Sequence, residues 1–338
     1  MKHIFTILLV LLIALFLCFS PVSLHADIPL SPIWSIQFSP DGKHLAVGIY
    51  QWVQLWDIQA RKVIRNFEPH ADAVRCLKFS NDGKTLFAGG GLPAQSGEIK
   101  IWNMESEDPI ATLDLHDDSI ESIALSPDGS KLLSASMDEN GFVISLPDGE
   151  VDRVLTQHVG RVLAVDYRPD GKYFVTGSED KTVKVWNPET YNVLVNFDRN
   201  DDAVYAVAFT PEENMIVSGS ADNAVRSWRI AESRGESGRI ETRGSLNRVY
   251  NGHQGTVYAV DCGRWRNQII IVSGSADTSV IVWDLRSGNQ VQTFDQPTDE
   301  VYAVDLSPDG RFVAAGGRDG TAYIWDLSNG NLIAELLQ

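Results

Sequence analysis

The chain has 338 residues, of which 43% are apolar, and its formal net charge is −17. The apolar fraction is enough for a substantial core, and the length is compatible with one large all-β domain. The acidic excess argues against nucleic acid as a partner, because phosphate binding requires a basic surface. A basic protein, a cation or simple solubility remain as explanations for it.

The N-terminus has the pattern of an export signal. Lys2 and His3 precede an apolar run from Ile4 to Phe19, and Ala26 provides a small residue before a cut at Asp27. The run is about 16 residues long, which is short for a membrane span. We therefore predict a signal peptide at 1–26 and an exported protein, periplasmic or extracellular, with no stable membrane span after cleavage. An uncleaved N-terminal anchor is the alternative.

One pattern then recurs seven times along the chain. Each copy opens with an apolar residue, and the copies begin near Ile33, Val74, Ile120, Val162, Val204, Val257 and Val301. A period of roughly 40 to 50 residues is typical of a four-stranded propeller blade. Residues 27–338 are thus predicted to form seven blades.

The last copy shows the pattern within a blade. Residues 301–306 alternate as in a strand, and Ser307–Gly310 has the composition of a tight turn. Three further strands follow, and 332–337 gives blade 7 a fourth strand of its own. Residues 27–32 include two prolines and suit a strand ladder poorly. We predict blades that are each continuous in sequence, with no interlocked strand closing the ring.

The third strand of several copies ends in a Trp-Asp dipeptide, at Trp56-Asp57, Trp283-Asp284 and Trp325-Asp326. Other copies carry degenerate forms, and the third copy has Ile144-Ser145 instead. The chain therefore resembles the WD-repeat family over residues 27–338. This resemblance implies an all-β, seven-bladed propeller of four-stranded antiparallel blades that works as a monomer, by binding rather than by catalysis, without a cofactor.

The resemblance also implies a structural hydrogen-bond tetrad of His, Ser or Thr, Asp and Trp. Two copies contain the full set: His158, Thr176, Asp180 and Trp186 in blade 4, and His253, Ser273, Asp277 and Trp283 in blade 6. A His–Asp–Ser set could suggest a hydrolase, but a catalytic triad would be expected only once. We therefore predict no catalytic residue and no metal site.

In this fold the second residue of each first strand faces the rim of the central channel. These residues are Trp34, Arg75, Glu121, Leu163, Tyr205, Tyr258 and Tyr302. Aromatic residues and arginine are enriched at interface hot spots, although tyrosines could also simply fill space between blades. The loops before these strands add Asp72, Asp118, Asp202 and Asp299 to the same face, as an acidic surface for a basic partner or a solvated rim.

Two insertions interrupt the period. Residues 89–98 form a Gly/Pro/Ser-rich segment in blade 2, interpreted as a binding loop or a harmless extension. Residues 230–247 lengthen the connection between the third and fourth strands of blade 5, and their polar composition predicts a mobile surface loop.

A weaker similarity links blades 1 and 2 to exported bacterial WD-repeat proteins associated with c-type cytochromes. The residues are Leu45–Gly48 with Trp56-Asp57, and the Gly-rich insertion with Pro93; the chain itself has no haem-attachment motif. We predict an exported, non-catalytic scaffold that binds a protein or peptide on this top face. The alternatives are an accessory subunit of a periplasmic redox system, an enzyme using the channel mouth, or a purely structural envelope protein.

Overall fold

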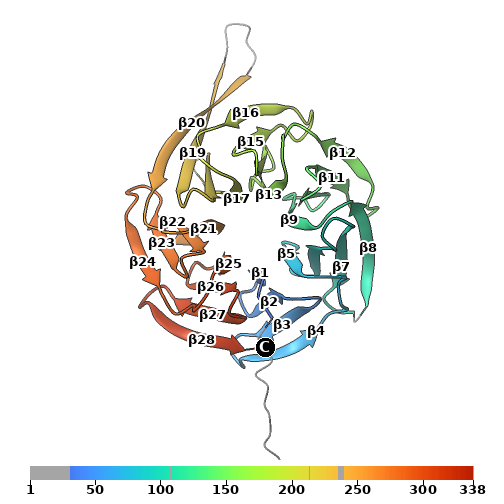
Figure 1. Cartoon of the computed structure of the whole chain (residues 1–338), viewed down its shortest axis with the longest axis vertical. Helices are drawn as coiled ribbons and strands as arrows, with labels where there is room; N and C mark the ends of the chain where they lie inside the picture. The colour runs from blue at the N-terminus through green and yellow to red at the C-terminus, as the bar shows by residue number, and fades with distance from the viewer. Residues whose placement is uncertain (1–30, 107, 213, 235–239, 338) are drawn as a thin grey trace, which may run out of the picture.

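The computed structural model describes residues 31–106, 108–212, 214–234 and 240–337. They form seven four-stranded antiparallel sheets in a ring around a central channel (Figure 1). Within these ranges there is no helix, and hence none that could cross a bilayer. The predicted all-β, seven-bladed fold is confirmed, whereas the predicted signal at 1–26 lies outside the described residues.

Every blade runs outward from the channel in sequence order, so its first strand is innermost and its fourth is outermost (Figure 1). The innermost strands are β1 (Ser35–Phe38), β5 (Val74–Phe79), β9 (Ile120–Leu125), β13 (Val162–Tyr167), β17 (Val204–Phe209), β21 (Val257–Trp265) and β25 (Val301–Leu306). The second strands are β2 (His44–Gly48), β6 (Thr85–Gly90), β10 (Lys131–Ser136), β14 (Phe174–Ser178), β18 (Met215–Ser220), β22 (Gln268–Ser275) and β26 (Phe312–Gly317).

The outer halves of the blades carry most of the surface. The third strands are β3 (Val53–Asp57), β7 (Gly97–Asn103), β11 (Gly141–Ser145), β15 (Val183–Trp186), β19 (Val225–Arg234), β23 (Val280–Asp284) and β27 (Thr321–Asp326). The outermost strands are β4 (Lys62–Asn66), β8 (Pro109–His116), β12 (Val151–Leu155), β16 (Val193–Phe197), β20 (Ile240–Tyr250), β24 (Gln290–Phe294) and β28 (Asn331–Leu337). Compared with the expected blade starts, only blade 1 differs, since β1 begins at Ser35.

The ring closes between blades 1 and 7 without a shared strand. β28 pairs with β27 of its own blade, from Asp326↔Asn331 to Thr321↔Leu337. Blade 1 packs against this sheet through a common apolar cluster, and the amide of Ile33 donates a hydrogen bond to Gly317 O at 2.8 Å. The predicted closure by face-to-face packing is confirmed.

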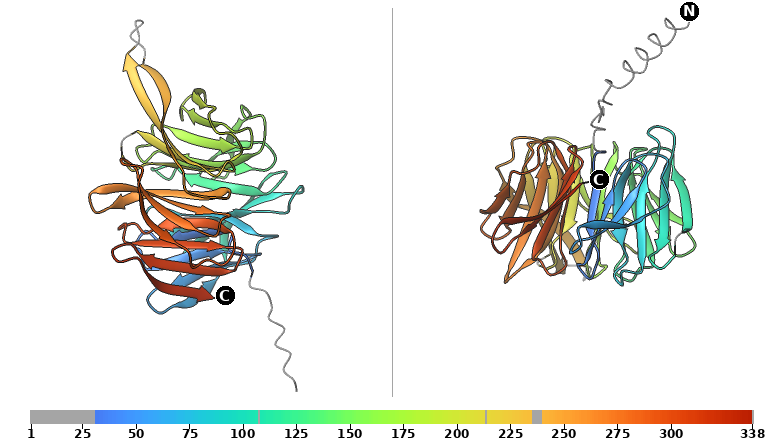
Figure 2. Two further views of the ribbon diagram at one scale, coloured as in Figure 1. Left: turned by 60° about the vertical axis from the view of Figure 1, so that its left-hand side comes forward. Right: turned by 90° about the horizontal axis from the view of Figure 1, so that it is seen from below.

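A long hairpin in blade 5 projects beyond the ring (Figures 1 and 2). β19 and β20 have 10 and 11 residues, and their pairing continues to Arg234↔Ile240. Glu232 ties the hairpin to blade 4, because Lys172 Nζ lies 2.7 Å from its carboxylate and Tyr173 donates a hydrogen bond to it. The prediction of a mobile loop at 230–247 was wrong for the residues of this segment that the structure describes, which are paired strand residues. These residues are polar and show no apolar alternation, and hydrogen bonds between the two backbones stabilise the hairpin.

Seven apolar clusters fill the interfaces between neighbouring blades. In six of them the tryptophan of a third strand packs against the preceding blade; these residues are Trp56, Trp102, Trp186, Trp228, Trp283 and Trp325. The cluster between blades 2 and 3 contains Ile144 instead and has no tryptophan. This interface is therefore the one irregular joint among the described residues of the ring.

Candidate binding site at the mouth of the central channel

The seven residues predicted at the rim lie together in the structure. Trp34, Arg75, Glu121, Leu163, Tyr205, Tyr258 and Tyr302 all line one cavity of about 270 Å³ at the top of the channel. Met137, from the turn between β10 and β11, completes the lining and was missed from the sequence. We refer to this cavity as the channel mouth.

Four of these side chains form a continuous row, which we term the aromatic arc. The rings of Trp34 and Tyr302 are stacked with centroids 4.8 Å apart. Tyr258 meets Tyr302 edge-on at 5.4 Å and Tyr205 at 5.3 Å. Such pairs add about 0.5–1.5 kcal/mol each to simple burial, so part of the role of these rings is to hold the rim together. Tyr205 nevertheless remains 37% exposed, so the arc still offers an aromatic surface to a ligand.

The opposite side of the mouth contains an ion pair. Arg75 Nε lies 3.3 Å from Glu121 Oε1, and the guanidinium covers the ring of Trp34 at 4.9 Å. Burial raises the pKa of Glu121, and the charge of Arg75 and a hydrogen bond from Ser119 oppose that rise. Arg75 thus stacks on one end of the arc while compensating the charge of a buried carboxylate.

The four predicted acidic residues occupy one repeated position, two residues before the innermost strand. Each carboxylate accepts a hydrogen bond from the backbone amide of the next residue, at 2.6–2.9 Å; the residues are Asp72, Asp118, Asp202 and Asp299. Their negative charges therefore surround the channel mouth in fixed positions. In the part of the chain that the structure describes, no three His, Cys, Asp or Glu side chains are placed to hold a metal ion.

The Gly-rich segment of blade 2 lies at this same end of the ring. Its turn spans residues 91–96, between β6 and β7, and the amide of Ala94 donates a hydrogen bond to Asp118 Oδ1 at 2.7 Å. The segment is therefore connected to blade 3 by the same aspartate that caps the start of β9.

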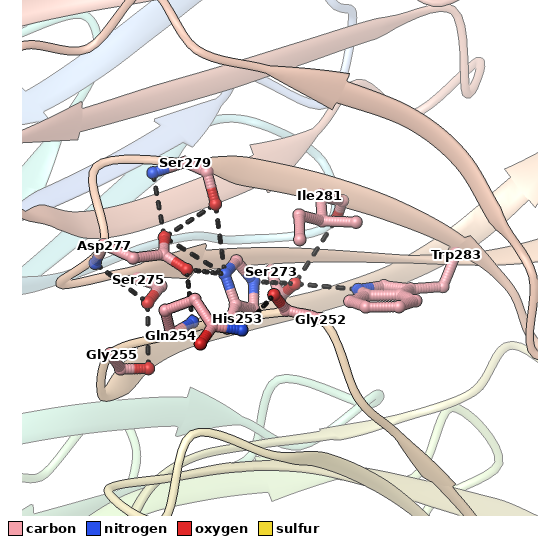
Figure 3. A network of polar contacts seen from close by, with 10 residues as sticks. All are labelled: Gly252, His253, Gln254, Gly255, Ser273, Ser275, Asp277, Ser279, Ile281 and Trp283. Atoms are coloured by element: carbon pink, nitrogen blue, oxygen red, sulfur yellow. Dashed lines mark hydrogen bonds and ion pairs between the residues drawn. The ribbon is translucent and has the colours of Figure 1, made fainter.

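The predicted tetrad residues of blade 6 form one buried hydrogen-bond chain (Figure 3). His253 Nδ1 lies 2.9 Å from Asp277 Oδ2, and its Nε2 lies 2.8 Å from Ser273 Oγ. Trp283 Nε1 donates to the same Ser273 Oγ at 2.9 Å. Each polar atom of the chain is occupied by a neighbour within the blade, so the serine is a structural link rather than an exposed nucleophile.

Blade 4 repeats this chain with a threonine. His158 lies 2.8 Å from Asp180 and 2.6 Å from Thr176, and Trp186 donates to Thr176 at 2.9 Å. Burial by itself would raise the pKa of Asp180, but hydrogen bonds from His158 and Thr182 hold it well below its usual value. The aspartate is therefore ionised and acts as a fixed acceptor.

The repeated sheets and tetrads agree with a comparison to known protein families. The family described as "WD domain, G-beta repeat" matches seven segments, at 23–57, 61–103, 107–143, 149–187, 192–229, 244–284 and 288–326. The chain belongs to the WD40-repeat family. WD40 propellers are generally non-catalytic interaction scaffolds.

The curated relatives match only parts of this WD40 protein. Eukaryotic translation initiation factor 3 subunit I of Pyricularia oryzae is 40% identical over 62 residues, 18% of this chain and 17% of the relative. The same subunit of Aspergillus terreus is 42% identical over 62 residues, 18% of each chain. The WD repeat domain-containing protein 83 homolog of Dictyostelium discoideum is 29% identical over 155 residues, 45% of this chain and 44% of the relative. The matched regions thus span less than half the length of these relatives.

These relatives contradict the predicted export to the periplasm or the outside of the cell. They are eukaryotic proteins named for translation initiation or for WD repeats, and none of the names describes an exported protein. The prediction of export was therefore wrong. It depended on the charged start, the apolar run of residues 4–19 and the small residue before Asp27, a local pattern that does not by itself specify a compartment.

Two WD40 blades contain tetrad substitutes that were missed from the sequence. In blade 7, Trp325 donates to Gln296 Oε1 at 2.8 Å, and Gln296 lies one residue farther from its strand than the histidines do. In blade 2, Glu98 takes the place of the aspartate, with its Oε1 3.1 Å from His70 Nδ1. Here Ala88 stands at the hydroxyl position, and His70 Nε2 and Trp102 Nε1 have no hydrogen-bond partner among the described residues.

A second group of residues that was missed from the sequence connects neighbouring WD40 blades through hydrogen bonds between their innermost strands. In four blades, the side chain four residues after the opening apolar residue accepts a hydrogen bond from the backbone of the next blade. Asp166 accepts from Phe209 at 2.7 Å, Asp261 from Leu306 at 2.8 Å, Asp305 from Phe38 at 2.6 Å and Gln37 from Phe79 at 2.7 Å. Burial raises the pKa of Asp166 to about 6 and also raises those of Asp261 and Asp305. The recurring Val-Asp pair was the available sequence signal.

Proposed function

We propose that this WD40 propeller is a non-catalytic scaffold that binds a basic segment of a partner protein at the channel mouth. The supporting observation is that the residues that directly follow the opening apolar residue of all seven blades line a single cavity. Partly exposed aromatic rings and fixed carboxylates lie at the same end of the ring, and both favour a cationic side chain. The fungal relatives are named as a subunit, so we further propose that this chain acts within a protein complex.

The chemistry of the mouth favours a basic partner over an acidic one. A guanidinium or ammonium group over an aromatic face gains about 0.5–2 kcal/mol, and Arg75 already makes such a contact with Trp34. The rings of Tyr258 and Tyr205 at the other end of the arc have no comparable cation among the described residues. Carboxylates around the mouth would also accelerate the approach of a basic segment at low salt.

Affinity capture with quantitative mass spectrometry tests this proposal. Wild-type protein and the variant Tyr205→Ala/Tyr258→Ala/Tyr302→Ala are immobilised in equal amounts and incubated with extract from the source cells. We expect the variant to recover at least ten-fold less of each partner protein than the wild type does. We also expect the proteins bound to the wild type to elute with rising salt. Unchanged recovery by the correctly folded variant would refute the site.

A matched control separates the channel mouth from other exposed apolar residues. Ile240 is 66% exposed at the start of β20, on the projecting hairpin. The variant Ile240→Ala removes exposed apolar surface without altering the mouth, and we expect it to recover the same partners as the wild type. Loss of the partners in this control instead would assign binding to the hairpin.

A further inference from the structure

A large hollow lies between blades 2 and 3, at the end of the ring opposite to the channel mouth. It has a volume of about 610 Å³, and its apolar wall is formed by Phe87, Ile101, Ala111, Leu125 and Leu146. Turns between the first and second strands of both blades form its edge. We refer to it as the blade 2–3 hollow. A volume of this size is within the range of ligand pockets.

The hollow coincides with the one interface that lacks a tryptophan. Ile144 pairs with Leu132 in the same register in which Trp186 pairs with Phe174 one blade later. In that next interface, Leu133 and Val143 of blade 3 share a core cluster with Trp186. Their register equivalents in blade 2 are Phe87 and Ile101, which here line the hollow.

A second substitution enlarges the same space. Leu125 pairs with Leu132 at the register position that Tyr167 occupies in blade 4 and Phe209 in blade 5. An aliphatic side chain thus stands where the two following blades have an aromatic ring. Two ring-sized side chains are therefore replaced by smaller ones at the interface that borders the hollow.

The edge of the hollow is polar and fixed. Asn81 Nδ2 donates a hydrogen bond to Pro127 O at 3.0 Å and so links the two turns. Hydrogen bonds from Ser80 and Ser126 lower the pKa values of Asp82 and Asp128, so both carboxylates at the edge are ionised at neutral pH. Ile110, 61% exposed, extends the apolar wall onto the surface.

We propose that the blade 2–3 hollow binds an aromatic side chain of tryptophan size from a partner protein, with a basic residue beside it in the partner sequence. The ring packs against Phe87 and Ile101, the register equivalents of the residues that share a cluster with Trp186 one blade later. The flanking cation meets Asp82 and Asp128, and the peptide backbone stays at the surface near Ile110. This site is independent of the channel mouth, because no lining residue is common to both cavities.

Fluorine NMR with a short peptide, Lys–(5-fluorotryptophan)–Lys with blocked ends, tests the proposal on the full chain. We expect broadening and a shift of the fluorine resonance on addition of wild-type protein, and competition by the unlabelled peptide. A peptide with leucine in place of tryptophan should compete at least ten-fold more weakly. Two results would overturn the assignment. One is a fluorine resonance that does not change with millimolar peptide in the presence of the protein, and the other is equal competition by the leucine peptide.

Two variants test whether the peptide binds in the hollow. Ile144→Trp restores the ring that the other interfaces have, and Leu125→Phe introduces the ring present in blade 5; each should weaken peptide binding at least ten-fold. Circular dichroism and thermal unfolding verify that each variant folds, and one folded variant is sufficient for the test. Binding that persists in a folded variant would overturn the proposal.

The rim variant Tyr205→Ala/Tyr258→Ala/Tyr302→Ala provides the matched control. Because the peptide is basic, the channel mouth can also bind it, but this variant should retain the part of peptide binding that Ile144→Trp or Leu125→Phe removes, since its substitutions lie at the other end of the ring. Complete loss of peptide binding in this variant would place the peptide at the channel mouth alone and overturn the assignment to the hollow. Failure of either site is thus distinguishable from failure of the other.

Discussion

The incomplete tetrad of blade 2 predicts that a single added hydroxyl stabilises the protein. Ala88 is fully buried at the register position where blade 4 has Thr176. In blade 6 the hydroxyl at this position bonds His253 Nε2 at 2.8 Å and accepts from Trp283 at 2.9 Å. The substitution Ala88→Ser would supply the same link between His70 and Trp102, whose facing nitrogen atoms have no partner in the described part of the chain.

The expected gain follows from two new buried hydrogen bonds. Each contributes about 0.5–1.5 kcal/mol net, and relieving a buried unpaired group adds to this, so we expect about 2 kcal/mol in the free energy of unfolding. At roughly 2 °C per kcal/mol for a domain of this size, the melting temperature should rise by about 4 °C. The added oxygen fits the same register position in blades 4 and 6, where the side chains are fully buried.

Urea unfolding and differential scanning calorimetry measure this change, and blade 7 offers a matched control. Ala315 occupies the same register position there, but Trp325 already donates to Gln296. Ala315→Ser therefore adds a buried hydroxyl where no neighbouring tryptophan nitrogen lacks a hydrogen-bond partner. We expect the free energy of unfolding to stay the same or to fall slightly. An Ala88→Ser variant no more stable than wild type, or an equal gain from Ala315→Ser, would refute the reasoning.

Two further predictions concern the polar links. Ser273→Ala should lower the free energy of unfolding by about 2–4 kcal/mol in urea titrations, because it orphans buried atoms of both His253 and Trp283; a loss below 0.5 kcal/mol, on the order of a neutral surface change, would contradict it. The pKa of Asp166 is about 6 in the folded protein against a usual 3.8, so its contribution to stability falls as pH rises from about 4 to 6. Asp166→Asn, which is uncharged throughout, should thus gain stability relative to wild type between pH 4.5 and pH 8, by up to about 3 kcal/mol; a difference that does not change with pH would contradict the assignment.

Features that repeat in every blade could be predicted from the sequence. The apolar residue at the start of each copy, such as Val74 or Val162, is buried because it packs between two sheets. In five of the blades the turn after the innermost strand is also specified locally, as where Ser126 donates to Asp128 and Gly129 takes a positive φ of 73°. The position of the rim residues followed from the resemblance to the WD-repeat family, once the apolar residue that opens each blade gave the register.

Features that depend on more than one blade could not be predicted in the same way. Asp166 and Asp261 appeared as ordinary polar positions of an alternating strand, yet their partners are amides of the next blade. Gln296 lies one residue farther from its innermost strand than the tetrad histidines do, so a search at the histidine spacing does not identify it. The hairpin of blade 5 is polar on both sides, and strand pairing without a buried face leaves no periodic signal.

The departures from the repeat are not distributed evenly around the ring. The aromatic arc belongs to blades 5, 6, 7 and 1, whereas the unpartnered tetrad atoms, the Gly-rich turn and the missing tryptophan all lie in blades 2 and 3. Each blade contacts mainly its neighbours, so a repeat protein can lose regular packing at one interface while the others keep their own. Blade 4, with a complete hydrogen-bond chain, lies between the irregular blade 3 and blade 5, where the arc begins. Because the channel mouth and the blade 2–3 hollow share no lining residue, we propose that two partners can bind this propeller at the same time, at opposite ends of the ring.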